Sequence, residues 1–299
     1  MRVIAFTVLD CRAVVARARE HGARVIREPS ESRDEFGTVV TAEIATFGDV
    51  IHRFVERKDY TGPFLPGHVA SEDHNDPLQQ FTPCPGLHTF DHVVGNQHEG
   101  ELNSWVTWYN HVLHLHTLSE YTVNTGESSL RTVIVSSANE AIKMPLIEPL
   151  QNVKKSQNQE YVDFNGGAGV QHIAFHTADI IHAVTQLRAR GVRFQEVPPQ
   201  YYSYIRRKLE NSRVVLKEDL QRLEELKILI DFDEHSTDPE PGYLLQIFTH
   251  LIQDRPTVFF ELIQRHKHEG FGEGNIKALF ECVEREQERR GNLTADTRE

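Results

Sequence analysis

The chain has 299 residues, which is length enough for about two ordinary domains with a sizeable buried core. It carries 32 Lys and Arg against 44 Asp and Glu, a formal net charge of −12, so nucleic acid and anionic membranes are poor partners, because both attract positive surfaces. The three cysteines, Cys11, Cys84 and Cys282, are too scattered for a disulfide framework, and no apolar run is long enough to span a membrane, so we expect a cytoplasmic protein.

An internal repeat organises the chain. The segments Ile4–Asp10 and Ile173–Asp179 read IAFTVLD and IAFHTAD, and in both copies a Gly follows the Ile by 18 residues and a Pro follows that Gly by seven. The stretch between the Asp and the Gly has apolar residues at helical spacing. Each copy therefore predicts a strand, an Asp N-cap, an amphipathic helix, a Gly that ends the helix, and a second strand.

A third unit starts at Phe90 and continues into a predicted helix at Asn103–Leu113. Each unit start is followed by further strand-like runs, which makes the repeating unit βαβββ and the fold class α+β. In chain order, these runs are Thr38–Ala45, Val50–Glu56, Arg131–Ser136, Ala141–Met144, Gly242–Thr249 and Thr257–Gln264.

The boundaries between the units follow from composition. A stretch rich in Pro and Gly, residues 62–85, predicts a linker between a first unit at 1–61 and a larger domain at 86–299. The last unit carries an insertion, Tyr201–Asp233, whose Leu and Ile spacing predicts one or two amphipathic helices. The segment Phe271–Asn275 is expected to form a hinge before a terminal helix.

Three residues have the character of metal ligands. His92 and His172 each lie early in the first strand of a unit, and Glu261 lies in the last strand of the final unit, between apolar neighbours. A carboxylate in such surroundings is costly to bury unless it is paired or bound to a cation. Two imidazoles and one carboxylate on one face form the ligand triad of non-haem Fe(II) oxygenases. A single strand histidine is more often a core or surface residue, so each ligand alone is a weak signal.

The first copy of the repeat argues for one metal site per chain. The position matching His172 is Val3, so the fold itself does not require a histidine there, and Glu56 is expected to occupy the place that Glu261 has in the last copy. The segment Gly166–Gly169 precedes a strand, so it is interpreted as a tight turn and not as a phosphate loop. The other clustered histidines are interpreted as solvated residues: His111, His114, His116, His266 and His268.

At these residues the sequence resembles the 4-hydroxyphenylpyruvate dioxygenase family, particularly its animal members, within the vicinal oxygen chelate superfamily. The matching stretches are FDHVVGNQ, SSLRTVIV, KKSQNQEYVDFNGGAGVQHIAF, GYLLQIFT, QDRPTVFFELIQRHKHEGFGEGN and EREQERRGNL, and the resemblance extends over essentially the whole chain. The resemblance implies tandem βαβββ modules, as in glyoxalase and bleomycin-resistance proteins, forming an open barrel with a C-terminal lid helix. It also implies that His92, His172 and Glu261 bind one Fe(II) per chain.

The resemblance assigns further residues to the site. Gln157 and Gln246 match glutamines that act near the iron. Phe248 and Phe271 match an aromatic pair that flanks a phenol ring, although ordinary core packing would explain both without the resemblance. The substrate-binding positions of the family correspond to Thr132, Ile147, Gln157, Gln171, Gln246, Phe248, Phe271 and Asn275.

Three positions depart from the family pattern. Ile147 stands where the family has Asn in a Pro-x-Asn-Glu-Pro motif, Thr132 replaces a usual Ser, and Ile276 replaces a usual Phe. The related 4-hydroxymandelate synthase is similar to this chain at Ile147, but it usually has Thr at the position of Pro145. Two alternatives therefore stay open: a hydroxylase of that kind acting on the same substrate, and a non-catalytic relative or fragment.

The reaction implied by the resemblance is the oxidative decarboxylation of 4-hydroxyphenylpyruvate by O₂, coupled to ring hydroxylation, which gives homogentisate and CO₂ in tyrosine and phenylalanine catabolism. The implied partners are these small molecules, with a homodimer as the expected assembly and no nucleic acid or membrane insertion. Members of the family open with one further βαβββ unit, so residues 1–61 are expected to be the second module of an incomplete N-terminal domain, and residues 86–299 the catalytic domain.

Overall fold

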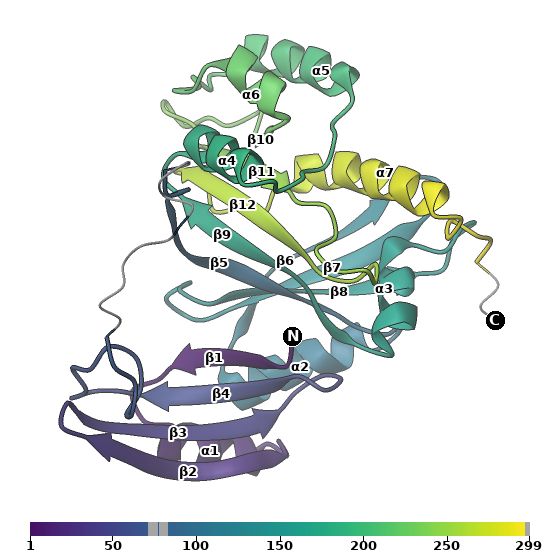
Figure 1. Cartoon of the computed structure of the whole chain (residues 1–299). Coiled ribbons are helices and arrows are strands. Elements are labelled where there is room, and N and C mark those ends of the chain that lie inside the picture. Colours follow the sequence, from purple (N-terminus) through teal and green to yellow (C-terminus); the bar gives the residue numbers. More distant parts are fainter. Residues whose placement is uncertain (71–76, 78–82, 297–299) are drawn as a thin grey trace.

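The computed structural model describes residues 1–70, 77 and 83–296, which form two β-sheets joined by the linker (Figure 1). The first unit makes a four-stranded sheet in the order β1-β4-β3-β2, with β1 parallel to β4. Its elements are β1 (Val3–Thr7), α1 (Cys11–Glu20), β2 (Val25–Asp34), β3 (Gly37–Ala45) and β4 (Ile51–Glu56).

The other two units share an eight-stranded sheet in the order β10-β11-β12-β9-β5-β8-β7-β6. Their first strands, β5 and β9, pair antiparallel at its centre. The second unit comprises β5 (Leu87–Asn96), α2 (Leu102–Leu113), β6 (His116–Asn124), β7 (Ser129–Ser136) and β8 (Lys143–Leu150). The third comprises β9 (Gly169–Thr177), α4 (Ile180–Ala189), β10 (Leu229–Asp231), β11 (Tyr243–Phe248) and β12 (Phe259–His266). The predicted fold class of tandem βαβββ modules is confirmed.

The predicted caps of the repeated helices are confirmed. The side chains of Asp10 and Asp179 each accept a hydrogen bond of 2.9 Å from the amide three residues on, which satisfies one free donor at the start of α1 and of α4. Gly22 and Gly191 follow the two helices with φ of 81° and 89°, a left-handed conformation that costs least at glycine. Identical local signals therefore produce the same strand–helix unit twice.

The described part of the chain has four further helices: α3 (Gln157–Asn165), α5 (Pro199–Glu210), α6 (Leu220–Leu226) and α7 (Glu273–Arg289). The insertion predicted from its apolar spacing forms α5 and α6, which lie at the far end of the molecule beyond α4 and β10 (Figure 1). The helix α7 lies across the eight-stranded sheet. The helix α3 was not predicted, since it has almost no amphipathic pattern and five of its nine residues are buried.

The strand β8 differs from its predicted end at Met144. It runs on through Pro145 and Pro149 to Leu150. Proline lacks the amide that a sheet ladder uses, but it is tolerated where no ladder bond is needed. On the side of β8 that faces β5, only Leu146 and Ile147 are paired with that strand. Pro145 and Pro149 lie outside this short pairing, so their missing amides break no hydrogen bond with β5.

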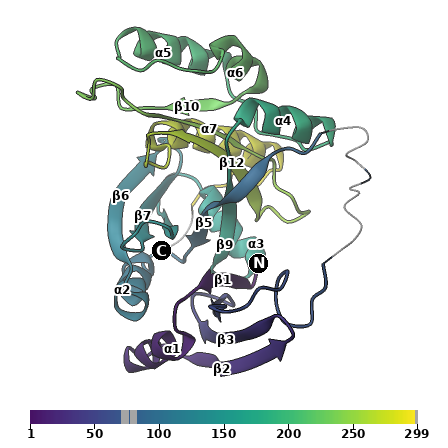
Figure 2. The same cartoon turned by 90° about the vertical axis from the view of Figure 1, so that its left-hand side faces the viewer.

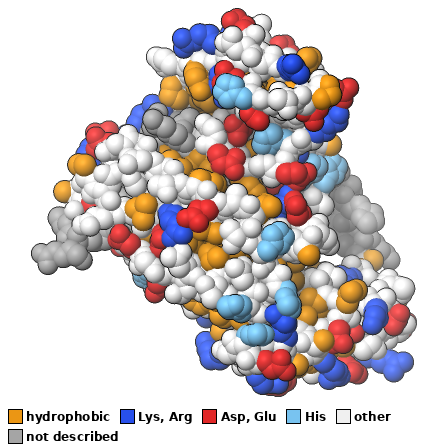
Figure 3. Space-filling view, turned by 180° about the vertical axis from the view of Figure 1, so that it is seen from behind, with side chains coloured by type: hydrophobic (Ala, Val, Ile, Leu, Met, Phe, Trp, Pro, Cys, Tyr) orange, Lys and Arg blue, Asp and Glu red, His pale blue; other side chains and the backbone are white. Residues whose placement is uncertain are grey.

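The first unit packs against α2, which lies between the two sheets (Figure 2). Ile4, Phe47 and Val50 share an apolar cluster with Leu102 and Tyr109 of α2. On the face seen from behind, acidic and basic side chains alternate and do not gather into one patch (Figure 3). Within the described residues, every helix is too short or too polar to cross a membrane.

A buried histidine in this interface makes the stability depend on pH. His52 is fully buried and its Nε2 lies 2.7 Å from the Tyr109 hydroxyl. Burial lowers the pKa of His52 from 6.5 to about 3, so below pH 6.5 the unfolded chain binds a proton that the folded chain does not. Stability is therefore complete above pH 6.5 and is lost as the pH falls toward 3. We expect this histidine to remove about 2 kcal/mol between pH 7 and pH 5.

Urea unfolding of wild type and His52→Phe at pH 7 and pH 5 measures this contribution. Phe is the matched substitution, because β-sheet register places Phe260 of the third unit where His52 lies in the first. The variant should lose about 2 kcal/mol less than wild type over that interval. Equal losses in the two proteins would contradict the assignment to His52.

Candidate metal centre and substrate pocket

Three adjacent strands bring the predicted ligands together. His92 lies on β5, His172 on β9 and Glu261 on β12, at the middle of the eight-stranded sheet. Ala174 on β9 pairs with His92 on one side and with Glu261 on the other. His172 lies two residues before Ala174, on the same face of β9, because side chains alternate along a strand. The small Ala174 side chain leaves the space in front of it to the three larger ones.

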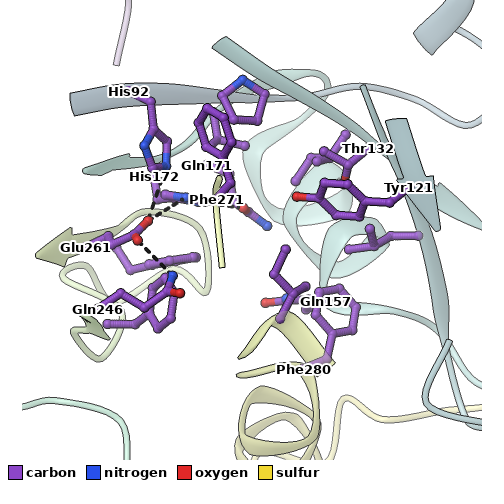
Figure 4. Close-up of a pocket in the computed structure, with 17 residues that line it drawn as sticks. His92, Tyr121, Thr132, Gln157, Gln171, His172, Gln246, Glu261, Phe271 and Phe280 are labelled. Atoms are coloured by element: carbon purple, nitrogen blue, oxygen red, sulfur yellow. Dashed lines mark hydrogen bonds and ion pairs between the residues drawn. The ribbon is translucent and has the colours of Figure 1, made fainter. Parts of the chain in front are cut away.

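The geometry of the three side chains suits one metal ion. Nε2 of His92 lies 3.2 Å and Nε2 of His172 lies 3.5 Å from Oε2 of Glu261 (Figure 4). Atoms that bind one divalent ion as neighbouring ligands lie about 3 Å apart, so a small closing movement would let all three side chains hold the same ion. Among the residues that the structure describes, this is the one group of His, Cys, Asp or Glu with all ligand atoms within 4.8 Å of one another.

A second layer of hydrogen bonds orients each ligand. Nδ1 of His92 lies 2.8 Å from Asp91 Oδ1, and Nδ1 of His172 lies 2.9 Å from Gln171 Oε1. Both acceptors hold a proton on Nδ1, which leaves each Nε2 as the atom that a metal ion would bind. Gln171, expected to bind substrate, thus contacts a metal ligand.

Burial and the neighbouring charges shift the pKa values of all three candidate ligands. Burial alone would lower the pKa of His92, but Glu261 and then Asp91 outweigh it and raise that pKa to about 9. Burial alone would raise the pKa of Glu261, yet the two imidazoles lower it to about 2. The pKa of His172 is lowered, chiefly by burial. The carboxylate is therefore ionised and balanced by positive charge, which a divalent ion would supply when bound.

A pocket opens on the metal-binding face and has a cavity volume of about 60 Å³. All the predicted site residues line this pocket except Asn275, which contacts the lining residue Gln246 instead. The lining residues are His92, Val94, Tyr121, Leu130, Thr132, Pro145, Ile147, Gln157, Gln171, His172, Gln246, Phe248, Phe259, Glu261, Phe271, Ile276 and Phe280 (Figure 4).

Several residues that line the pocket were not predicted from the sequence. Tyr121 comes from β6, and its neighbour across the ladder is Thr132 on β7, which in turn pairs with Ile147 on β8. Phe280 lies on α7, one helical turn after Ile276. The only sequence signal for Phe280 is its four-residue spacing from Ile276.

The expectation for Glu56 was wrong. Ala5 of β1 corresponds to Ala174 of β9 in the repeat. Ala5 pairs with Arg53 of β4, and Ala174 pairs with Glu261 of β12, so Arg53 occupies the position of Glu261 in the first unit. Glu56 corresponds instead to Gln264. Its carboxylate accepts the amide of Cys11 at 2.9 Å, and Gln264 makes the equivalent bond at the start of α4. The first unit therefore has Val3 and Arg53 at the positions that His172 and Glu261 occupy in the third unit.

These features match known proteins. The model of the Glyoxalase/Bleomycin resistance protein/Dioxygenase superfamily matches residues 89–207, so fold and site together define a metal-site protein of that superfamily. The chain is 48% identical, over 97% of its length, to 4-hydroxyphenylpyruvate dioxygenase of Dictyostelium discoideum, and it covers 78% of that protein. It is 47% identical, over 98% of its length, to the enzyme of that name in Danio rerio, of which it covers 73%. The chain belongs to the 4-hydroxyphenylpyruvate dioxygenase family.

Solved structures share this fold. A triple mutant of 4-hydroxymandelate synthase from Streptomyces coelicolor superposes with a TM-score of 0.76 at 30% identity, over 96% of this chain and 77% of that one. A fusion of a xylose isomerase-like TIM barrel with a 4-hydroxyphenylpyruvate dioxygenase shares the fold, with a TM-score of 0.66 at 21% identity over 96% of this chain and 41% of that one.

Proposed function

We propose that this chain is an Fe(II)-dependent dioxygenase that converts 4-hydroxyphenylpyruvate and O₂ to homogentisate and CO₂. The observation that carries the proposal is the convergence of His92, His172 and Glu261 on one buried point beside the pocket, in a chain of this family. The two-histidine, one-carboxylate set is the ligand choice of non-haem Fe(II) oxygenases, and it leaves positions open on one side of the ion. Fe(II) bound there would supply chelation of the 2-oxo acid and activation of O₂.

The protein's own residues would bind and orient the substrate. The amides of Gln157 and Gln246 lie where they can hydrogen-bond a polar substrate, and Phe248 and Phe271 offer aromatic faces to a phenol ring. The apolar walls, Ile147 among them, would exclude water from the reacting atoms. The start of α7 would have to open for entry and close for reaction.

A second candidate is a hydroxylase of the 4-hydroxymandelate synthase kind. It is favoured by Ile147, which is buried in the pocket wall and presents no polar group to the substrate. The similarity to a synthase structure at 30% identity is consistent with it, although the curated relatives at 47 to 48% identity carry the dioxygenase name.

Product analysis separates the two candidates. The protein is loaded with Fe(II) without oxygen, and 4-hydroxyphenylpyruvate and O₂ are then added. We expect homogentisate, with one CO₂ released per product. A 4-hydroxymandelate peak would replace the first proposal by the second. If a folded, iron-loaded chain forms neither product, both are excluded.

From the family resemblance we also propose a cytoplasmic location, a homodimer, and an organisation into a first module at 1–61, a linker at 62–85 and a catalytic domain at 86–299. Size-exclusion chromatography with light scattering tests the assembly, and expression of residues 86–299 alone tests whether that part folds by itself.

A further inference from the structure

A line of hydrogen bonds leads from the insertion helix α5 to the metal ligand Glu261. Nε2 of Gln246 donates to Glu261 Oε1 at 3.0 Å, and Nδ2 of Asn275 donates to Gln246 Oε1 at 3.0 Å. The hydroxyl of Tyr201 donates to Asn275 Oδ1 at 2.6 Å and accepts the amide of Ile230 at 2.7 Å. We call Tyr201, Asn275, Gln246 and Glu261 the relay.

The carboxylate end fixes the direction of every bond in the relay. An ionised carboxylate only accepts, so Gln246 must turn its NH₂ group to Glu261 and its oxygen to Asn275. Asn275 must then present its own NH₂ to Gln246, which leaves its oxygen facing Tyr201. Asn275 Oδ1 therefore needs a hydrogen-bond donor, and the Tyr201 hydroxyl is that donor. The Tyr201 hydroxyl also lies 3.0 Å from Ile230 O, but its single proton serves the shorter contact with Asn275.

Three of the four relay residues are buried, so water does not compete for the hydrogen bonds among Glu261, Gln246 and Asn275. Gln246 and Asn275 are each 1% exposed, and Glu261 is 2% exposed. An amide turned the wrong way there would leave a buried donor or acceptor without a partner. Because Gln246 ties down Oε1 of Glu261, the other oxygen, Oε2, is the one that faces both imidazoles.

Asn275 is the relay residue that lies in the first turn of α7. Its two partners come from β11 and α5, so Asn275 is held between fixed groups. Gly272, with φ of 76°, lets the chain pass directly against Gln246 Oε1, where any side chain would collide. Phe271 and Ile276, which flank this turn, both line the pocket, so a movement of the turn would change access to the metal-binding face.

We propose that Tyr201 is a positioning residue that couples docking of the first turn of α7 to the orientation of Glu261. When Asn275 docks, its hydrogen bond with Tyr201 fixes the orientation of the Asn275 amide, and Asn275 in turn fixes the orientation of the Gln246 amide. Gln246 then binds Oε1 of Glu261, so that Oε2 is the oxygen available to the metal. When the turn undocks, Gln246 Oε1 loses the hydrogen bond that it accepts from Asn275. The Gln246 amide is then no longer fixed, and the Glu261 carboxylate is free to rotate. The inference rests on the proposed function only for its consequence in catalysis.

The neighbouring tyrosine is a matched control. Tyr202 lies on the same helix, is fully buried, and donates its hydroxyl to the Ile228 carbonyl at 2.9 Å. Tyr201→Phe and Tyr202→Phe each remove one buried hydroxyl from α5. Only the first of these hydroxyls belongs to the relay.

Two readouts test the proposal without turnover. Hydrogen exchange at Asn275 and Ile276, whose amides bond to Gly272 O at 2.8 and 3.0 Å, reports docking of the first turn of α7. The visible spectrum of the Co(II)-loaded protein reports the ligand arrangement at the metal. We expect Tyr201→Phe to speed exchange at these amides about tenfold, to alter the Co(II) spectrum and to lower kcat/KM about tenfold. Tyr202→Phe should leave all three unchanged.

Two results would overturn the proposal. In one, the two variants show the same exchange and the same Co(II) spectrum. In the other, Tyr201→Phe speeds exchange but leaves the spectrum unaltered, which would break the link to Glu261. If wild type forms no homogentisate while Tyr201→Phe still changes exchange and spectrum, the proposed function fails and the positioning role stands.

Discussion

Replacing His172 by Ala is expected to abolish metal retention. The remaining ligands, His92 and Glu261, cannot hold a labile Fe(II) by themselves, and the ring of His172 also packs against Phe259 with centroids 4.6 Å apart. Losing a residue that merely orients a ligand typically costs about 10- to 100-fold in affinity or activity, and losing the ligand itself should cost more. We expect iron content after desalting to fall to background and homogentisate formation to fall more than about a hundredfold.

His266→Ala is the control for this prediction. His266 lies on the same strand as Glu261, but its Nε2 contacts Glu218 Oε1 at 2.8 Å and takes no part in the metal group. Iron content should therefore stay at one per chain in His266→Ala. Equal iron loss in both variants would show that His172 matters through general stability and not as a ligand.

Asp91→Ala is expected to have the second-largest effect, because Asp91 serves two buried partners. Its carboxylate orients His92 and forms two hydrogen bonds of 2.8 Å with Arg265. Although burial raises the pKa of Asp91, its bonds with Arg265 and His92 outweigh this and hold that pKa below its usual value. The side chains of Asp91 and Arg265 are only 10% and 13% exposed.

Removing Asp91 alone leaves the Arg265 charge uncompensated. Such a change typically costs about 3 to 5 kcal/mol of stability. It also removes the acceptor that orients His92, so metal affinity should fall about 10- to 100-fold. Arg265 further donates to the carbonyls of His268 and Gly270 and lies 5.5 Å from the centre of the Phe271 ring, so the pocket wall should loosen as well.

The double variant Asp91→Ala, Arg265→Met separates the two consequences. It buries no unpaired charge, so its free energy of unfolding in urea should recover toward wild type. Its metal affinity, measured by titration with Co(II), should stay low, because His92 still lacks its acceptor. Recovery of both quantities would mean that Asp91 acts on the metal only through stability.

Much of the local structure could be predicted because its causes lie within a few residues. The Asp N-caps, the helices that follow them and the glycines at φ near +80° to +90° all depend on short-range hydrogen bonds and on the sterics of single residues. The ligand set could be predicted for a related reason. Glu261 stands among apolar neighbours, where only a paired or metal-bound carboxylate is stable.

The sequence by itself therefore determined the repeated βαβββ modules and the three ligand candidates, since both depend on residue type and local spacing. The tertiary structure decided everything that depends on register and on contacts between distant segments. It placed Arg53, and not Glu56, in the position of Glu261, because the register of β4 against β1 differs by three residues from the one expected, and register decides which side chain faces the site. It also joined Tyr201 to Asn275 across 74 residues of chain, a contact that no local spacing can encode.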